Sequence, residues 1–163
     1  MDIFDTFRAS ANPEQAVKMK SYMRDQFDYL GIQTPLRRKL SRDVIKMHKD
    51  VDWSFIFKCW KQPEREFQYL AIDCLDRVKS ALSSSDILNL KRLIIEKSWW
   101  DTVDGIDVIV GGIALRHPEV SGDENELLWL DVNGNFFDMS RFAGEGNIGH
   151  IYEIVKQNRP ELD

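Results

Sequence analysis

Hydrophobic and polar positions along most of the chain follow the period of an α-helix. From residue 2 to residue 117, apolar residues recur every three or four positions, and no long stretch alternates with the two-residue period of a half-buried strand. This pattern predicts an all-α structure for that part of the chain.

Proline and capping residues indicate where the helices begin. Pro13, Pro35 and Pro63 suit a first helical turn, because that turn needs no backbone donor. Asp52 is the predicted N-cap of a short helix that continues to Trp60. The other predicted caps are Thr34, Ser84 or Ser85, and Ser98.

Each helix is expected to bury its apolar stripe. The stripe after Pro13 includes Val17 and Tyr22, with Met19 and Met23 on or near the same side. The stripe after Pro35 consists of Leu36, Leu40, Val44 and Met47. The stripe after Pro63 consists of Phe67, Leu70, Ala71, Cys74, Leu75 and Val78.

The helix openings recur loosely along the chain. Pro35, Pro63 and Trp99 lie 28 and 36 residues apart, which is typical of stacked helix pairs in a HEAT-like α-solenoid. An ordinary helical bundle is the alternative, since the spacing is irregular.

The remaining residues have a different pattern. Asn133 and Gly134 stand between two short apolar runs, which predicts a small β-hairpin near the C-terminus. Gly144, Gly146 and Gly149 then precede a predicted terminal helix over residues 150–158. Their spacing is that of a dinucleotide-binding loop, but the strand-helix-strand unit that such a loop requires is not found here. A glycine-rich loop without a cofactor is therefore the favoured interpretation.

Length and composition fit one folded domain. The chain has 163 residues, of which 43% are hydrophobic and 30% are charged. It has no apolar run long enough to cross a membrane and no signal-peptide pattern, so we expect a cytoplasmic protein.

Charge is divided unevenly along the chain. The net charge of −5 argues at first against a nucleic-acid binder, since phosphate contacts require Lys and Arg. However, residues 1–119 carry 19 basic and 18 acidic residues, whereas residues 120–163 carry 3 and 9. The negative net charge therefore comes from residues 120–163.

An aromatic residue and a carboxylate stand one helical turn apart in the segment KSWWDTVD. Trp100 and Asp104 share a helical face, where an indole ring attracts cations and a carboxylate stabilises developing positive charge. The alternative is structural: the tryptophan packs in the core and the aspartates solubilise the helix start.

A basic cluster follows the segment GIQTP. Arg37, Arg38, Lys39 and Arg42 are placed to approach a phosphate backbone, although short basic clusters are often only solvated surface. In the block PEREFQ, the two glutamates of a first helical turn suit the helix dipole and predict a structural role. Arg65 of that block is expected to face the same surface as the basic cluster.

Neither a metal nor a cofactor is predicted. His48, His117 and His150 lack the spacing of metal ligands. Cys59 and Cys74 match neither a zinc pair nor a disulfide framework, so both are expected to be reduced core thiols.

Several of these segments, taken in order, resemble the DNA alkylation repair family of HEAT-like-repeat DNA glycosylases, the AlkD-like proteins. The resemblance covers residues 3–119 and favours the α-α superhelix, in shortened form. It rests on five segments: Tyr22-Met23, the run from Phe27 through Leu30 to Pro35, Arg37-Arg38, the block PEREFQ at 63–68, and the block KSWWDTVD at 97–104.

The resemblance implies an activity and site residues. The activity is excision of cationic alkylpurines, such as N3-methyladenine and N7-methylguanine, from double-stranded DNA by N-glycosidic bond hydrolysis, without an enclosed base-flipping pocket. Asp104 and Trp100 match the catalytic positions. The positions near bound DNA are matched by Tyr22, Gln33, Thr34, Arg37 and Arg38.

The family's second half has no counterpart recognisable after residue 117. The sequence thus predicts a HEAT-like domain over residues 1–119 and a divergent acidic tail over residues 120–163. Two alternatives to a glycosylase stay open: a non-catalytic DNA- or protein-binding module, and a truncated fragment. An open solenoid end would also expose an apolar helix face and favour a homo-oligomer.

Overall fold

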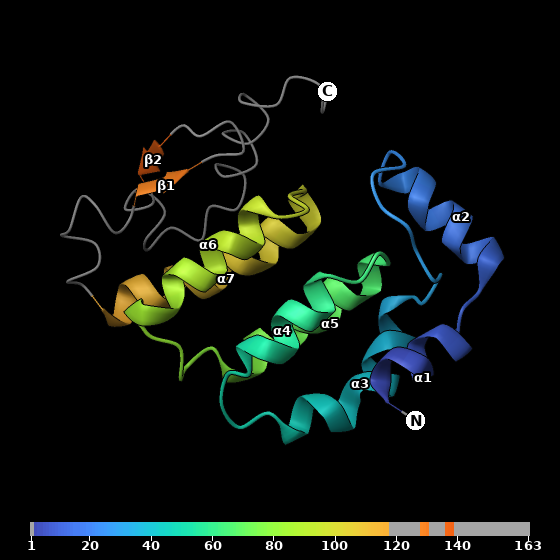
Figure 1. Cartoon of the computed structure of the whole chain (residues 1–163), viewed down its shortest axis with the longest axis horizontal. Coiled ribbons are helices and arrows are strands. Elements are labelled where there is room, and N and C mark those ends of the chain that lie inside the picture. The colour runs from blue at the N-terminus through green and yellow to red at the C-terminus, as the bar shows by residue number, and fades with distance from the viewer. Residues whose placement is uncertain (1, 118–127, 131–135, 139–163) are drawn as a thin grey trace. The chain divides into compact units, whose positions relative to one another are not determined.

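The computed structural model describes residues 2–117, 128–130 and 136–138. Contacts between Cα atoms divide the chain into two compact units, Met1–Val78 and Lys79–Asp163. The helical prediction is confirmed, since seven α-helices lie within residues 2–117 (Figure 1).

The first unit contains five α-helices. They are α1 (Ile3–Ala9), α2 (Pro13–Tyr22), α3 (Thr34–Met47), α4 (Trp53–Trp60) and α5 (Arg65–Val78). α5 packs against both α3 and α4, and α1 packs against α3.

Most of the predicted helix starts are confirmed to within two residues. Pro13 is the first residue of α2, and Asp52 caps α4 by accepting a hydrogen bond of 3.0 Å from the Phe55 amide. Thr34 is not the cap of α3 but its first residue, because Gln33 occupies the N-cap position. Local sequence therefore sets these boundaries well.

The core of the first unit centres on α5. All six residues predicted for its apolar stripe are buried, which confirms that prediction. The ring of Phe67 lies between those of Phe4 and Phe7, with ring centres 5.1 and 5.4 Å apart, and this stack attaches α1 to α5. Cys59 and Cys74 are buried free thiols, as predicted, and burial raises the pKa of both.

The predicted stripe of α3 is wrong at its two ends, while Leu40 and Val44 between them are half-buried. Leu36 and Met47 are 42% and 79% exposed, and the buried side of the helix carries Arg37 and Ser41 instead. The polar face can be buried because its groups are satisfied. Arg37 pairs with Asp73 of α5, and the Ser41 hydroxyl donates to the Arg37 carbonyl oxygen at 2.8 Å.

The predicted stripe of α2 is wrong within the helix, since none of its ten residues is buried, but Met23, which directly follows the helix, is buried as predicted. Val17 and Tyr22 are 69% and 74% exposed. The helix is attached near its two ends. The Asn12 amide donates to the Leu30 carbonyl oxygen at 2.8 Å, and Lys20 pairs with Asp28 at 2.9 Å.

The second unit contains a 3₁₀ turn, η1 (Ser84–Asp86), followed by α6 (Ile87–Ile95) and α7 (Trp100–Arg116), which pack together. The predicted serine caps are wrong. Ser83 forms a capping box with Asp86, and Trp99 is the N-cap of α7 without a side-chain hydrogen bond. The buried apolar residues of these helices are Ile87, Leu90, Leu93, Ile94, Val103, Ile106, Ile109, Val110 and Ile113.

Two short strands in the second unit confirm the predicted antiparallel pairing. β1 (Leu128–Leu130) pairs with β2 (Phe136–Asp138), with Trp129 opposite Phe137 (Figure 1). The predicted turn at Asn133-Gly134, the glycine run at 144–149 and the terminal helix at 150–158 lie outside the described residues. The boundary predicted near residue 119 also lies outside them and stays a prediction.

Within the described residues, no helix has both the length and the apolar character needed to cross a membrane.

Candidate functional site

The loop that precedes α3 is held by one buried carboxylate. Glu66, the second residue of α5, has no exposed surface. Its Oε2 accepts a hydrogen bond from the Leu30 amide at 3.0 Å, and its Oε1 accepts from the amides of Gly31 and Ile32 at 2.8 and 3.1 Å. We call Glu66 and these three amides the Glu66 cradle.

Gly31 is required in the Glu66 cradle for two reasons. Its φ of +85° lies in the left-handed region, where side chains are disfavoured. A Cβ atom built on it would also lie 2.1 Å from the Asn12 carbonyl oxygen. The close approach of the loop to the start of α2 therefore depends on this glycine.

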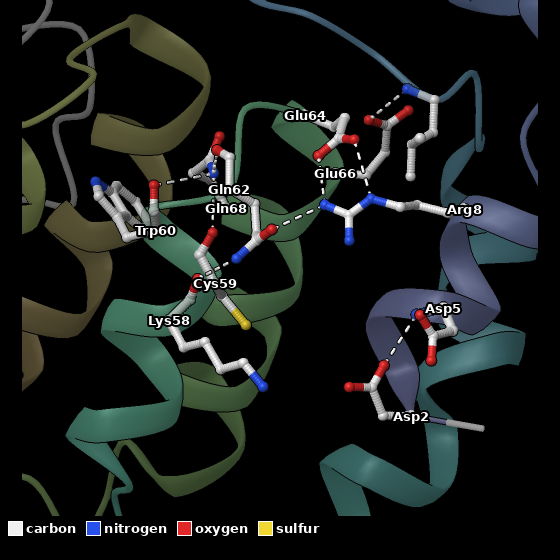
Figure 2. A network of polar contacts seen from close by, with 11 residues as sticks. Asp2, Asp5, Arg8, Lys58, Cys59, Trp60, Gln62, Glu64, Glu66 and Gln68 are labelled. Carbon is white, nitrogen blue, oxygen red and sulfur yellow. Dashed lines mark hydrogen bonds and ion pairs between the residues drawn. The ribbon is translucent and has the colours of Figure 1, made fainter.

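A second network surrounds the start of α5 (Figure 2). Arg8 of α1 donates to Glu64 at 3.1 and 3.2 Å and to the Gln62 side chain at 2.8 Å. The Gln68 side chain donates to three backbone carbonyl oxygens at the end of α4, those of Cys59, Trp60 and Gln62. The block PEREFQ thus has the predicted structural role, but specific hydrogen bonds provide it in addition to the helix dipole.

Arg65 does not face the basic cluster, so that expectation is wrong. The residue is fully buried, and its guanidinium carbon lies 3.7 Å from the centre of the Phe27 ring. Its amide donates to the Asp28 carbonyl oxygen at 2.8 Å. Arg65 therefore anchors the loop between α2 and α3.

The residues that follow the Glu66 cradle are presented at the surface. Gln33 and Thr34 are exposed, whereas Arg37 is only 7% exposed. The Arg37 guanidinium donates to Asp73 at 3.2 and 3.3 Å and to the Thr34 hydroxyl at 3.4 Å. Arg37 thus positions Thr34 and carries a neutralised charge, while Arg38 is exposed.

Tyr22 stands at a hollow of about 250 Å³ between α2 and the tyrosines of the neighbouring segments. Tyr29 and Tyr69 also line it, and their hydroxyl groups are hydrogen-bonded at 3.1 Å. The Arg37 guanidinium carbon lies 5.0 Å from the centre of the Tyr69 ring. Three tyrosines therefore line the hollow, and one of them, Tyr69, contacts Arg37 of α3, the helix that begins at Thr34.

Trp100 and Asp104 stand on α7, in the second unit. Trp100 is its first residue, Asp104 is one turn further along, and both are half-buried. The Oδ1 atom of Asp104 is buried and has no hydrogen-bond partner among the described residues. Such an acceptor is costly to leave unpaired in a folded protein, so this oxygen requires a donor that the described residues do not supply.

The acidity of Asp104 is altered by its surroundings. Burial, followed by the nearby carboxylates of Asp107 and Asp101, raises the pKa of Asp104 to about 6. Asp107 is 5% exposed, and burial raises its pKa as well. A carboxylate with a pKa close to neutrality is suited to accept a proton.

Two further unpartnered groups precede Asp104 in the sequence. The Ser98 hydroxyl and the Trp99 indole nitrogen are buried without a hydrogen-bond partner among residues 2–117 and the two strands. Three unsatisfied polar groups thus occur within seven residues at the start of α7. Buried unsatisfied groups are uncommon in folded proteins, and the other one in the described residues, Gln68 Oε1, lies in the network at the start of α5.

The predicted site residues fall in two places. Tyr22, Gln33, Thr34, Arg37 and Arg38 belong to the first unit, and Trp100 and Asp104 belong to the second. Sequence reasoning missed two features. One is the contact of Glu66 with the loop at 30–32, for which the sequence gives no local sign. The other is Asp107, whose three-residue spacing from Asp104 was visible.

Comparisons with known proteins agree with the resemblance read from the sequence. Residues 3–130 match the family model described as DNA alkylation repair enzyme. A solved structure, a predicted DNA alkylation repair enzyme from Enterococcus faecalis, matches with a TM-score of 0.68 and 26% identity, over 91% of this chain and 74% of that one. This likeness supports the predicted all-α superhelix class. No curated protein matches the chain.

Proposed function

The chain belongs to the DNA alkylation repair enzyme family, and from this premise we propose that it excises cationic alkylated purines from double-stranded DNA by hydrolysing the N-glycosidic bond. The expected substrates are lesions of the N3-methyladenine and N7-methylguanine type. The observation that carries the proposal is the half-buried carboxylate of Asp104, one turn from Trp100, whose Oδ1 atom has no hydrogen-bond partner among the described residues.

The chemistry of the substrate matches a single carboxylate. Alkylation places a positive charge on the purine, so the base leaves as a neutral molecule with the electron pair of the bond to C1′. Positive charge then develops on the sugar, as in glycoside hydrolysis. The enzyme has to stabilise that charge and supply water, because the leaving group is already activated.

Asp104 is proposed to perform both tasks. Its carboxylate stabilises the oxocarbenium-like sugar. The oxygen of a water molecule bonds to C1′, and Asp104 accepts the proton that this water loses. With a pKa of about 6, most of the Asp104 carboxyl groups are ionised at pH 7 and able to act in this way.

The remaining residues are proposed to bind the substrate. Trp100 presents an indole ring to the cationic lesion and its sugar. In the other unit, Tyr22, Gln33 and Thr34 are exposed and contact the DNA backbone, with Arg38 as a phosphate ligand. Arg37 acts through Thr34, since its own charge is paired with Asp73.

The test is release of methylated bases from methylated duplex DNA by the purified protein, measured by mass spectrometry at pH 8. Asp104→Asn is expected to lower the rate by roughly 10²- to 10³-fold, the usual effect of removing a stabilising group of this kind. Asp5→Asn, which removes an exposed carboxylate of α1, is the control and should leave the rate unchanged.

Two results would overturn the proposal. A folded wild-type protein that releases no base from methylated DNA is not a glycosylase, and a non-catalytic DNA-binding module then takes its place. Base release that survives Asp104→Asn would remove the catalytic role from this carboxylate, even if the activity itself stands.

A further inference from the structure

A groove lies between α3 and α5. Its first lining residue, Arg38, stands one helical turn after Thr34. The groove has a volume of about 480 Å³. It is lined by Arg38, Arg42, Ile45, Lys46, Asp73, Asp76 and Arg77. Four of these seven residues are basic, so the groove is a positively charged part of a chain that is acidic overall.

Three of the cations form a line along α3. Arg38, Arg42 and Lys46 are spaced by four residues, which places them on one helical face at intervals of about 6 Å. All three are exposed, and none of them forms an ion pair within the described residues. We call these three residues the α3 stripe.

The α3 stripe differs from the other charged pairs at this spacing. Glu14 pairs with Lys18 at 3.0 Å, and Arg92 pairs with Glu96 at 2.7 Å, both with opposite charges. Like charges at four-residue spacing disfavour the helix that carries them. Folding therefore gives no reason for the α3 stripe, which points to a ligand with negative charges.

The carboxylates of the groove do not cancel these cations. Asp73 is engaged by the buried guanidinium of Arg37 at 3.2 Å, so its charge is already balanced from inside the unit. Asp76 is the other carboxylate of the lining, which also contains Arg77 and the three cations of the α3 stripe, so the basic side chains outnumber the acidic ones. An excess of positive charge is left at the surface of the groove.

We propose that the α3 stripe, extending to Lys46, binds the phosphates of one strand of duplex DNA without regard to sequence or lesion. This proposal rests on the proposed function, which makes DNA the substrate. From Arg38 to Lys46 the stripe extends about 12 Å. Its three cations are therefore far enough apart to contact separate phosphates of one DNA strand.

The α3 stripe also has the right neighbours for this role. It begins at Arg38, one turn after Thr34, so a strand that contacts Thr34 can continue along α3. Phosphate contacts fix the position of a protein on DNA without reading its bases. The stripe would thus hold undamaged and damaged DNA alike.

The test measures binding of full-length protein to an unmethylated, fluorescent duplex by anisotropy over a range of salt concentrations. The double variant Arg42→Gln with Lys46→Gln removes two cations of the stripe. The control, Lys49→Gln with Lys61→Gln, removes two exposed lysines outside the groove and the same net charge. Circular dichroism checks that both variants are folded.

The stripe variant is expected to bind about 100-fold more weakly at 50 mM salt, and its slope of log K against log salt should fall by about 2. The control should keep the wild-type slope. Arg42→Lys should also keep it, since a point charge suffices for a phosphate. The loss should be equal for methylated and unmethylated duplexes.

The outcomes separate this proposal from the proposed function. An unchanged slope in the stripe variant, or an equal change in the control, overturns the α3 stripe as a phosphate site while base release stands. A loss confined to methylated DNA overturns its independence of the lesion. If the wild-type protein binds DNA with a steep salt dependence but releases no base, the phosphate site is supported and the glycosylase activity is overturned. A wild-type protein that binds no duplex at 50 mM salt overturns the stripe.

Discussion

Two carboxylates near helix starts have opposite environments. Glu66 is the second residue of α5, is fully buried, and accepts three backbone hydrogen bonds. Asp104 is the fifth residue of α7, is half-buried, and has a buried oxygen with no partner among the described residues. Burial alone therefore does not make a carboxylate reactive.

The difference indicates which carboxylate stabilises the fold and which is available for chemistry. Amides that point at Glu66 stabilise its charge and are themselves satisfied, so the group and the loop fix each other. In the described part of the chain no such donor reaches the buried oxygen of Asp104, and the nearby Asp101 and Asp107 of the same helix are acidic. The environment of Glu66 stabilises the fold. The buried oxygen of Asp104 still requires a hydrogen-bond donor or a positive charge.

The largest effect on stability is expected from Glu66→Gln. The new amide group would place donors against the backbone amides of the loop, and the free energy of unfolding should fall by about 3 kcal/mol. Urea denaturation followed by circular dichroism measures this. Glu64→Gln is the matched control, since Glu64 binds the partly exposed Arg8, and it should cost at most about 1 kcal/mol. Equal losses in the two variants would contradict the role of the cradle.

Gly31→Ala tests the loop side of the same contact. The left-handed φ and the contact with the Asn12 carbonyl oxygen should lower the free energy of unfolding by about 2 kcal/mol. Gly111→Ala in α7 is the opposite case, because its added Cβ would meet no atom within 4 Å. That variant should gain up to about 1 kcal/mol, since alanine favours a helix more than glycine does. Urea denaturation of both variants decides the matter, and a neutral Gly31→Ala would count against the close approach.

Asp104→Asn should stabilise the protein while it slows base release. The pKa of Asp104 in the folded state, about 6, exceeds its ordinary value of 3.8, so folding is favoured as pH falls between those values. At neutral pH the variant should gain about 1 kcal/mol, less than the full shift implies because the group is partly solvated. Thermal unfolding at pH 7.5 and pH 4.5 measures this gain, which should shrink at the lower pH. A variant less stable than the wild type at pH 7.5 would contradict it.

The smallest effect concerns the pH dependence of base release. The rate should fall as pH drops through about 6, where the Asp104 carboxylate becomes protonated and can no longer accept a proton. Asp107→Asn removes a nearby negative charge, which should lower the pKa of Asp104 and move this limb by less than about one pH unit. Initial rates between pH 5 and pH 8 test the shift, and a limb that moves upward would exclude the proposed electrostatic contact.

The sequence predicts well what depends on local chemistry. Pro13 and Asp52 mark helix starts because a first turn needs capping and tolerates proline. The stripe of α5 is buried as predicted, since that helix packs against both α3 and α4. The strand pair of the tail follows from the apolar runs on either side of Asn133-Gly134.

The sequence fails where distant residues decide burial. Arg37 lies inside because Asp73, 36 positions later, neutralises it, and helical periodicity contains no sign of that partner. The same is true of Glu66, whose donors lie about 35 positions earlier. For the candidate site, residue types could be proposed from the resemblance, but the exposure of Gln33 and the burial of Arg37 could not.

Helix α2, in which no residue is fully buried, has a consequence for dynamics. Because no side chain of its ten residues is fully buried, local unfolding of α2 exposes little apolar surface to water. Its amide hydrogens should therefore exchange with heavy water sooner than those of α5. A ligand that contacts Tyr22 would order this weakly buried helix, and part of its binding free energy would be spent on slowing that exchange.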